Sequence, residues 1–172
     1  GDQGGRTVLV TGANSGLGYE TARALAQHGA HVVMACRSEA KAAAAAERIE
    51  ATNPSGSVEI LLTDMADLDS IAGSAAQFTA DHDTLDVLVN NAGIMATPYG
   101  TTAQGFEQQL GVNHLGHFAL TALLLPSLFA AGEGSRVVNV SSTAHRFGRM
   151  DFADLMSTVS YTHLRAHETS EN

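Results

Sequence analysis

A glycine-rich turn, "TGANSGLG" at residues 11–18, has the residue types and spacing needed to bind phosphate. It follows a short apolar run, 6–11, and leads directly into a stretch with the composition of a helix. Glycines at such a junction let the backbone turn tightly and approach a pyrophosphate, and the helix N-terminus supplies N–H donors. A tight turn without a ligand is the alternative, but the position between strand and helix favours dinucleotide binding.

The end of the second apolar run bears on which dinucleotide would bind. An acidic residue there binds the ribose 2′-hydroxyl of NAD(H), whereas a nearby arginine accommodates the 2′-phosphate of NADP(H). The sequence "MACRS" (34–38) has Cys36 followed by Arg37 and contains no carboxylate. It therefore favours NADP(H) over NAD(H), with a solvated surface charge as the alternative interpretation of Arg37.

Alternating apolar runs and helical stretches predict the elements that must position these residues. Strands rich in valine, isoleucine and leucine, as in a parallel sheet buried on both faces, are expected at 6–11, 31–36, 58–63, 86–91 and 136–141. Helices are expected at 17–29, 39–52, 67–81 and 103–131, the second with Ser38 as its N-cap. The pattern predicts an α/β fold with a doubly wound parallel sheet, whose ligands bind beyond the carboxyl ends of the strands.

Polar residues follow two of the later strands, at this same edge. Asn90 and Asn91 come directly after "DVLV", and because buried amides are costly unless hydrogen-bonded, we expect them to tie neighbouring segments together. Ser141 and Ser142 end the fifth strand. Because adjacent strand residues point to opposite faces, only one of these serines is expected to face the cleft.

Composition excludes several classes of function. A net charge of −9 without a Lys/Arg cluster argues against nucleic acid as a partner. One cysteine cannot form an internal disulfide, which favours a reducing compartment and hence a cytoplasmic location. The longest apolar stretch, 118–131, is short and interrupted by Pro126, so no transmembrane segment is expected. His114 and His117 are three residues apart, but no carboxylate or cysteine cluster accompanies them, so we predict helix packing and no metal site.

Four motifs in order, "TGANSGLG", "NNAG" (90–93), "VNHLGHF" (112–118) and "VVNVSS" (137–142), resemble the short-chain dehydrogenase/reductase family, in particular its retinol-dehydrogenase-like branch. The similarity covers roughly residues 2–157. It implies a Rossmann-type sheet with strand order 3-2-1-4-5, truncated after the fifth strand. It also implies hydride transfer between a nicotinamide and a small-molecule alcohol or carbonyl substrate, of lipophilic character by the branch it resembles, and it is compatible with a homo-oligomeric parent protein.

The resemblance also implies roles by position. Asn113 would hold a proton-relay water, and Ser142 would hydrogen-bond the substrate carbonyl. Asp64 and Met65 would lie at the adenine. The pyrophosphate would contact Gly12, Asn14, Ser15, Gly16, Leu17 and Gly18, and the ribose and nicotinamide would contact Asn91, Ala92 and Gly93.

The family mechanism needs a tyrosine with a lysine four residues later, because the lysine lowers the pKa of the phenol. The sequence offers Tyr161 and Arg165, and a planar guanidinium is a poor substitute for an ammonium group. Residues 158–169 also match the translation of a transposase adapter used in sequencing libraries. We therefore expect an incomplete domain at 1–157, a non-native or disordered tail at 158–172, and an inactive fragment of an active parent. A natural divergent tail is the alternative.

Two other functions stay open. One is a non-catalytic NADP(H)-binding module, and the other is a nucleotide-sugar epimerase on the same fold, against which "NNAG" and "NHLGHF" argue.

Overall fold

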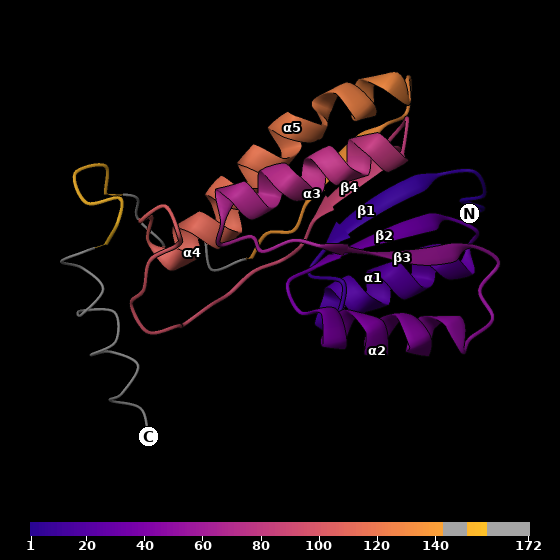
Figure 1. Cartoon of the computed structure of the whole chain (residues 1–172), viewed down its shortest axis with the longest axis horizontal. Helices are drawn as coiled ribbons and strands as arrows, with labels where there is room; N and C mark the ends of the chain where they lie inside the picture. Colours follow the sequence, from indigo (N-terminus) through magenta and orange to yellow (C-terminus); the bar gives the residue numbers. More distant parts are fainter. Residues whose placement is uncertain (143–150, 158–172) are drawn as a thin grey trace.

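A five-stranded parallel sheet with helices on both faces forms the centre of the molecule (Figure 1). The computed structural model describes residues 1–142 and 151–157; the predicted tail at 158–172, with Tyr161 and Arg165, lies outside them. The strand order β3-β2-β1-β4-β5 confirms the predicted doubly wound fold. The strands are β1 (Thr7–Thr11), β2 (His31–Cys36), β3 (Ser57–Leu62), β4 (Val87–Asn90) and β5 (Arg136–Asn139).

Helices α1 (Gly16–Gln27) and α2 (Glu39–Glu50) cover one face of the sheet, and α3 (Leu68–Asp81) and α5 (Gly116–Ala130) cover the other (Figure 1). The central strands are apolar on both faces, which is why they are buried from both sides. Thus Val8 packs in the core beneath α1 and α2, whereas its neighbour Leu9 packs in the core beneath α3 and α5.

The prediction of one α-helix at 103–131 is wrong in two respects: the helix begins later, and a π-helical turn interrupts it. Residues before α4 (Gln108–Leu110) are not helical, because Thr101 and Glu107 form an antiparallel bridge there. The buried carboxylate of Glu107 then accepts hydrogen bonds from the backbone N–H groups of Gln109 and Leu110 in α4 and so caps the start of the helix. A π-helical turn, η1 (Gly111–Leu115), separates α4 from α5, and such turns often occur at functional sites.

The fifth strand differs most from its prediction. β5 ends at Asn139 and all four of its residues are exposed, whereas the sequence predicted a buried strand over 136–141. In the described part of the chain β5 pairs with β4 alone, so it forms an edge of the sheet. Val137 and Val138 are 39% and 43% exposed for this reason.

The helical stretch Gln108–Ala130 is 23 residues long and, by length and composition alone, could cross a membrane. It is longer than the apolar run on which the sequence expectation rested. A core helix of a globular domain passes the same test, and here the stretch carries Leu120, Leu124 and Leu128 into the core against α3.

A buried hydroxyl joins the carboxyl ends of β1 and β4 to α5. The oxygen of Thr11 accepts hydrogen bonds of 2.9 Å from the backbone N–H groups of Asn91 and Ala92. It also lies 2.9 Å from Nε2 of the buried His117 side chain. The amide of Asn91 in turn donates to the Thr11 carbonyl. Thr11 therefore determines where the "NNAG" segment leaves the sheet.

The contacts of His117 define its tautomer. Nδ1 faces the carbonyl oxygen of Asn113 at 3.1 Å, and a carbonyl only accepts, so Nδ1 carries the proton. Nε2 is then free to accept the Thr11 hydroxyl proton. Burial lowers the pKa of His117, and the nearby His114 adds to this effect. The neutral imidazole is the form that fits this network.

Thr11→Val should lower the free energy of unfolding by about 2–4 kcal/mol, because it leaves two backbone N–H groups and the His117 nitrogen without their partner. Thr11→Ser keeps the hydroxyl and should cost less than about 1.5 kcal/mol, mainly from the lost methyl group. Urea denaturation of both variants measures the difference. A larger loss in Thr11→Ser than in Thr11→Val would show that the methyl group, and not the hydroxyl, is the important part.

The pH dependence of stability should contain a His117 component. The folded pKa is lowered, so as the pH falls below about 6.5 the unfolded chain takes up a proton that the folded chain resists. Stability should therefore fall on acidification from about pH 6.5. Chemical denaturation across pH should show a shallower decline for His117→Gln than for the wild type, and parallel curves would contradict this assignment.

Candidate functional site

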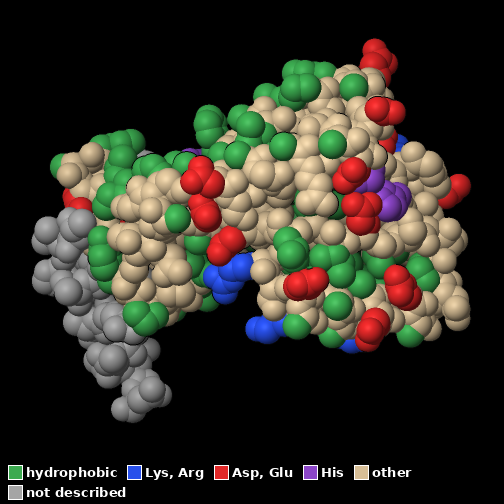
Figure 2. All heavy atoms as spheres, viewed as in Figure 1, with side chains coloured by type: hydrophobic (Ala, Val, Ile, Leu, Met, Phe, Trp, Pro, Cys, Tyr) green, Lys and Arg blue, Asp and Glu red, His purple; other side chains and the backbone are tan. Residues whose placement is uncertain are grey.

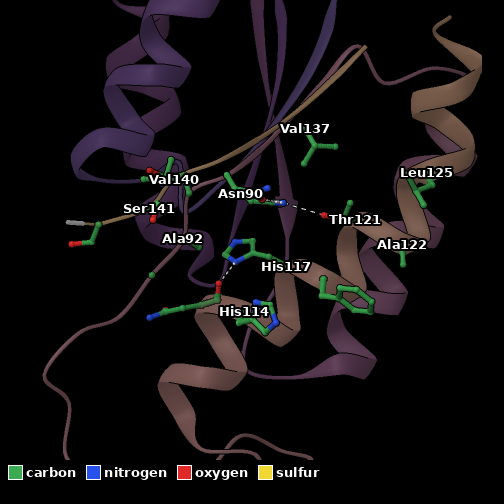
Figure 3. A pocket seen from close by; sticks show the side chains of 16 residues that line it. Asn90, Ala92, His114, His117, Thr121, Ala122, Leu125, Val137, Val140 and Ser141 are labelled. Carbon is green, nitrogen blue, oxygen red and sulfur yellow. Dashed lines mark hydrogen bonds between the residues drawn. The ribbon is translucent and has the colours of Figure 1, made fainter. Parts of the chain in front are cut away.

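Two adjoining cavities lie at the carboxyl edge of the sheet. The first, which we name the glycine-turn cavity, has a volume of about 450 Å³ and lies between the turn after β1 and the ends of β2 and β3. The second, the β5–α5 cavity, has a volume of about 790 Å³ and lies between β5 and α5 (Figure 3). Asn91, Ala92, Gly93 and Val140 line both cavities and form the boundary between them.

The glycine-turn cavity brings together most of the residues predicted to bind a dinucleotide. Those that line it are Gly12, Asn14, Ser15, Leu17, Arg37, Asp64, Met65, Asn91, Ala92 and Gly93. Gly16 and Gly18 do not line it but belong to the same turn.

The glycines of the turn serve different physical purposes. Gly12 has φ of +66°, and a Cβ there would lie 3.0 Å from Cα of Ala92, so only glycine fits between the turn and "NNAG". A Cβ on Gly18 would collide with the Gly12 carbonyl and the Asn91 amide, so this glycine lets α1 pack closely. Gly16 instead has no described atom within 4 Å of such a Cβ, which leaves its backbone open to a ligand.

The N-terminus of α1 points its backbone N–H groups at this open space. Ser15 is the N-cap, yet among the described residues its side chain makes no capping hydrogen bond. No acidic residue occupies the first turn of the helix. The N–H groups and the positive end of the dipole are thus available to an anion, which a chain of net charge −9 must bind through local geometry.

Two exposed cations lie at the rim of the same cavity. Arg37 follows β2, and Lys41, the only lysine in the chain, lies in the first turn of α2. Sequence reasoning missed Lys41, although its spacing of four from Arg37 across the N-cap Ser38 was a usable signal. Burial raises the pKa of the neighbouring Cys36 thiol to about 11, so this thiol stays neutral and unreactive.

The segment between the two cavities is held on both sides. On one side Thr11 and Asn91 fix it to β1. On the other side the amide of Asn113 donates to the Ile94 carbonyl at 2.8 Å and accepts from the Ile94 N–H at 2.9 Å. Asn113 thus couples the π-helical turn to this segment, whereas its predicted role in a proton relay stays a prediction.

Asn90 ties three elements together, as the sequence predicted for this edge. Its amide nitrogen donates to Thr121 of α5 at 3.0 Å and to the side-chain oxygen of Asn139 on β5 at 2.8 Å. Figure 3 shows the bond between Asn90 and Thr121 running across the cavity. These bonds position β5 and α5 on opposite sides of the β5–α5 cavity.

Both serines after β5 are among the residues that line this cavity. The expectation that only one of their side chains faces the cleft stays a prediction. The expectation assumed strand geometry at Ser141 and Ser142, but β5 ends at Asn139 and strict alternation ends with it. His117 packs between α5 and β1 as predicted, whereas His114 is exposed at the cavity wall.

The comparisons with known proteins agree with this geometry. The family model for short chain dehydrogenases matches residues 6–154. Human retinol dehydrogenase 12 is 48% identical over 158 residues, which cover 92% of this chain and 50% of that protein. Human retinol dehydrogenase 13 is 48% identical over 151 residues, 88% of this chain and 45% of that protein. The chain spans about half the length of these relatives.

Solved structures show the same fold. An uncharacterized protein from Mycobacterium paratuberculosis is 48% identical, with a TM-score of 0.77 over 92% of this chain and 54% of that one. The Pseudomonas aeruginosa RhlG/NADP complex is 28% identical, with a TM-score of 0.73 over 95% of this chain and 64% of that one. A metagenomic short-chain oxidoreductase in complex with NADP is 30% identical, with a TM-score of 0.73 over 96% and 76%. Motifs, fold and relatives agree, and the chain belongs to the short chain dehydrogenase family.

Proposed function

We propose that this chain holds NADP(H) in the glycine-turn cavity and forms the cofactor-binding part of an oxidoreductase that acts on an alcohol or carbonyl. One observation carries the proposal. The open glycine turn, the cations Arg37 and Lys41, and the "NNAG" segment all line a single cavity or its immediate border. RhlG and the metagenomic oxidoreductase, both similar in fold, were solved with NADP.

The residues fit the parts of the cofactor in order. The N-terminus of α1 would bind the pyrophosphate, and Arg37 with Lys41 would bind the 2′-phosphate. The adenine would lie by Asp64, whose carboxylate is fixed by a 2.9 Å bond from the N–H of Ala66. The nicotinamide would reach the segment from Asn91 to Gly93. When bound, the cofactor supplies or accepts the hydride.

The β5–α5 cavity is the place that we propose for the substrate. It adjoins the glycine-turn cavity through the shared "NNAG" residues, so a substrate there would face the nicotinamide end. Its walls combine apolar side chains, such as Leu125 and Val137, with the hydroxyl of Ser142, which we propose to hydrogen-bond the reacting oxygen. An alcohol or carbonyl on an apolar body fits this lining, in agreement with relatives named retinol dehydrogenases.

The proton transfer needs a group that the chain does not offer. The 172-residue sequence contains no tyrosine that is followed four positions later by a lysine, since its single lysine is Lys41 in α2. We therefore propose that this chain binds cofactor without turning over substrate, and that a longer parent protein, cytoplasmic and homo-oligomeric, carries the activity. The same observation supports the second candidate, a non-catalytic NADP(H)-binding module.

Arg37→Gln and Lys41→Gln should each weaken NADPH binding about 10- to 100-fold, because each removes a charged contact to the 2′-phosphate. NADH, which lacks that phosphate, should bind the wild type and both variants within about twofold of one another. Titration calorimetry with both cofactors measures this discrimination.

Arg23→Gln is the matched control for this experiment. It removes the same charge from a half-buried arginine that pairs with Glu20 on α1, outside the cavity. NADPH affinity should not change in this variant. An equal loss in all three variants would indicate a general charge effect, and an equal loss for NADH would remove the case for a 2′-phosphate site.

The purified 172-residue chain should bind NADPH yet show no carbonyl-dependent NADPH oxidation above the uncatalysed rate. Retinal and a medium-chain aldehyde are suitable substrates, with absorbance of NADPH as the readout. NADPH binding by the same sample serves as the control for folding. Turnover that disappears in Tyr161→Phe would show that Tyr161 acts as the proton donor after all.

A further inference from the structure

A cluster of two histidines and one glutamate lies at the amino edge of the sheet, opposite the two cavities. His31 is the first residue of β2, whose last residue, Cys36, lines the glycine-turn cavity. Glu59 lies on β3, and His82 is the C-cap of α3. Three separate elements thus bring their side chains to one place, and neither the cofactor site nor the substrate cavity uses them.

The ligand atoms of this cluster are spaced as for a metal ion. Nε2 of His31 lies 3.0 Å from Oε2 of Glu59, and Nε2 of His82 lies 3.3 Å from the same oxygen. The ligand atoms of the three residues all lie within 4.8 Å of one another. Zn²⁺ bonds of about 2.0–2.1 Å in a tetrahedral site place ligand atoms about 3.3 Å apart. The two histidine nitrogens, no more than 4.8 Å apart, would take two further sites of the tetrahedron beside the Glu59 oxygen.

Ser57 orients one of the histidines for this purpose. Nδ1 of His31 lies 2.7 Å from the Ser57 hydroxyl, and the two residues are direct partners in the register of β2 and β3. The hydroxyl oxygen can accept a hydrogen bond from Nδ1–H, and in that tautomer the lone pair of Nε2 is available to a metal. Histidine ligands in proteins are commonly fixed by such a bond from the other ring nitrogen.

The second histidine has an unused coordinating atom. The ring of His82 packs against Phe78, with ring centres 4.7 Å apart, and against His31 at 5.3 Å. Its Nε2 is buried, and among the described residues it has no hydrogen-bond partner, although Glu59 lies within ion-pair distance. An unpaired buried nitrogen is unfavourable, and a metal bond would relieve it.

The surroundings favour a cation with solvent access. Asp81 and Asp83 flank His82, and both are exposed. Figure 2 shows histidine side chains at the surface among acidic ones, at the end of the molecule where the N-terminus lies in Figure 1. The side chains of His31, Glu59 and His82 are 33%, 35% and 16% exposed, which leaves room for water as a further ligand.

We propose that His31, Glu59 and His82 bind a divalent ion of the first transition row, with Zn²⁺ as the physiological representative. Two imidazoles and one carboxylate are a ligand set that suits zinc, and a water molecule completes the tetrahedron. The ion would join β2 and the edge strand β3 to the end of α3. The alternative is a histidine–glutamate hydrogen-bond cluster that binds no metal.

Titration of the metal-free, full-length chain with Zn²⁺, in competition with a chromophoric chelator, tests the proposal. Glu59→Gln and His82→Gln should each weaken Zn²⁺ binding by more than about 100-fold, because an amide is a much weaker zinc ligand than a carboxylate or an imidazole. Ser57→Ala should weaken binding only about 10- to 100-fold, as expected for a partner that orients a ligand. His28→Gln is the matched control, since His28 bonds the Ala24 carbonyl within its own helix end.

A second measurement identifies the coordination. Co²⁺ bound to the wild type should show the strong visible absorption of tetrahedral cobalt, and Glu59→Gln should lose it while retaining wild-type circular dichroism. NADPH affinity should be unchanged in Glu59→Gln, so this test is independent of the proposed function. Zn²⁺ affinity equal in the wild type, Glu59→Gln and His82→Gln would overturn the proposal, because it would place any bound ion on other histidines. An absence of Zn²⁺ binding by the wild type would overturn it as well.

Discussion

The hydroxyl of Thr11 is the interaction on which the functional edge of this protein depends. It accepts hydrogen bonds from two backbone N–H groups of the segment after β4, and it lies against a buried histidine of α5. One small side chain thus sets the distance between the glycine turn and the "NNAG" segment. That distance is short, so position 12 must be glycine, because a Cβ there would lie 3.0 Å from the α-carbon of Ala92. The wall shared by the two cavities consequently has a fixed position before any ligand binds.

Features of the fold that depend on residues close together in the sequence were predicted correctly. Features that depend on contacts between distant residues were not. Apolar runs of valine and leucine gave the parallel sheet because burial on both faces leaves a local signature. The same apolar pattern wrongly predicted that β5 is buried, since its valines are exposed because the strand lies at the edge of the sheet. The π-helical turn at 111–115 was also missed, because the contact of Gly111 with Thr102 has no periodic pattern. In the site, contiguous motifs were identified, whereas Thr11 and Lys41 were missed as partners. His31 and Glu59 are brought together by the pairing of β2 with β3, and His82 joins them from the end of α3, so no local pattern indicates this cluster.

The two edges of the sheet differ in the ligand charge that they favour. At the carboxyl edge the N-terminus of α1 presents unpaired N–H groups and positive potential, and Arg37 and Lys41 lie beside it. At the amino edge α3 ends, so its carbonyl groups direct negative potential at His82, next to Asp81 and Asp83. The alternation of parallel strands and helices imposes this separation. A pyrophosphate and a divalent cation would therefore bind the same domain at opposite edges without competing.

The glycine-turn cavity and the β5–α5 cavity also differ in how firmly the described residues hold them. The glycine-turn cavity is built mainly on β1, β2 and the segment after β4, where core residues such as Leu9 and Val33 are fully buried. The β5–α5 cavity has one wall on an exposed edge strand, held to β4 by its ladder and by the bond between Asn90 and Asn139. Elements with few buried contacts open more readily than the core. Cofactor binding should accordingly be the more robust property, and the geometry around Ser142 should depend on whatever packs against β5.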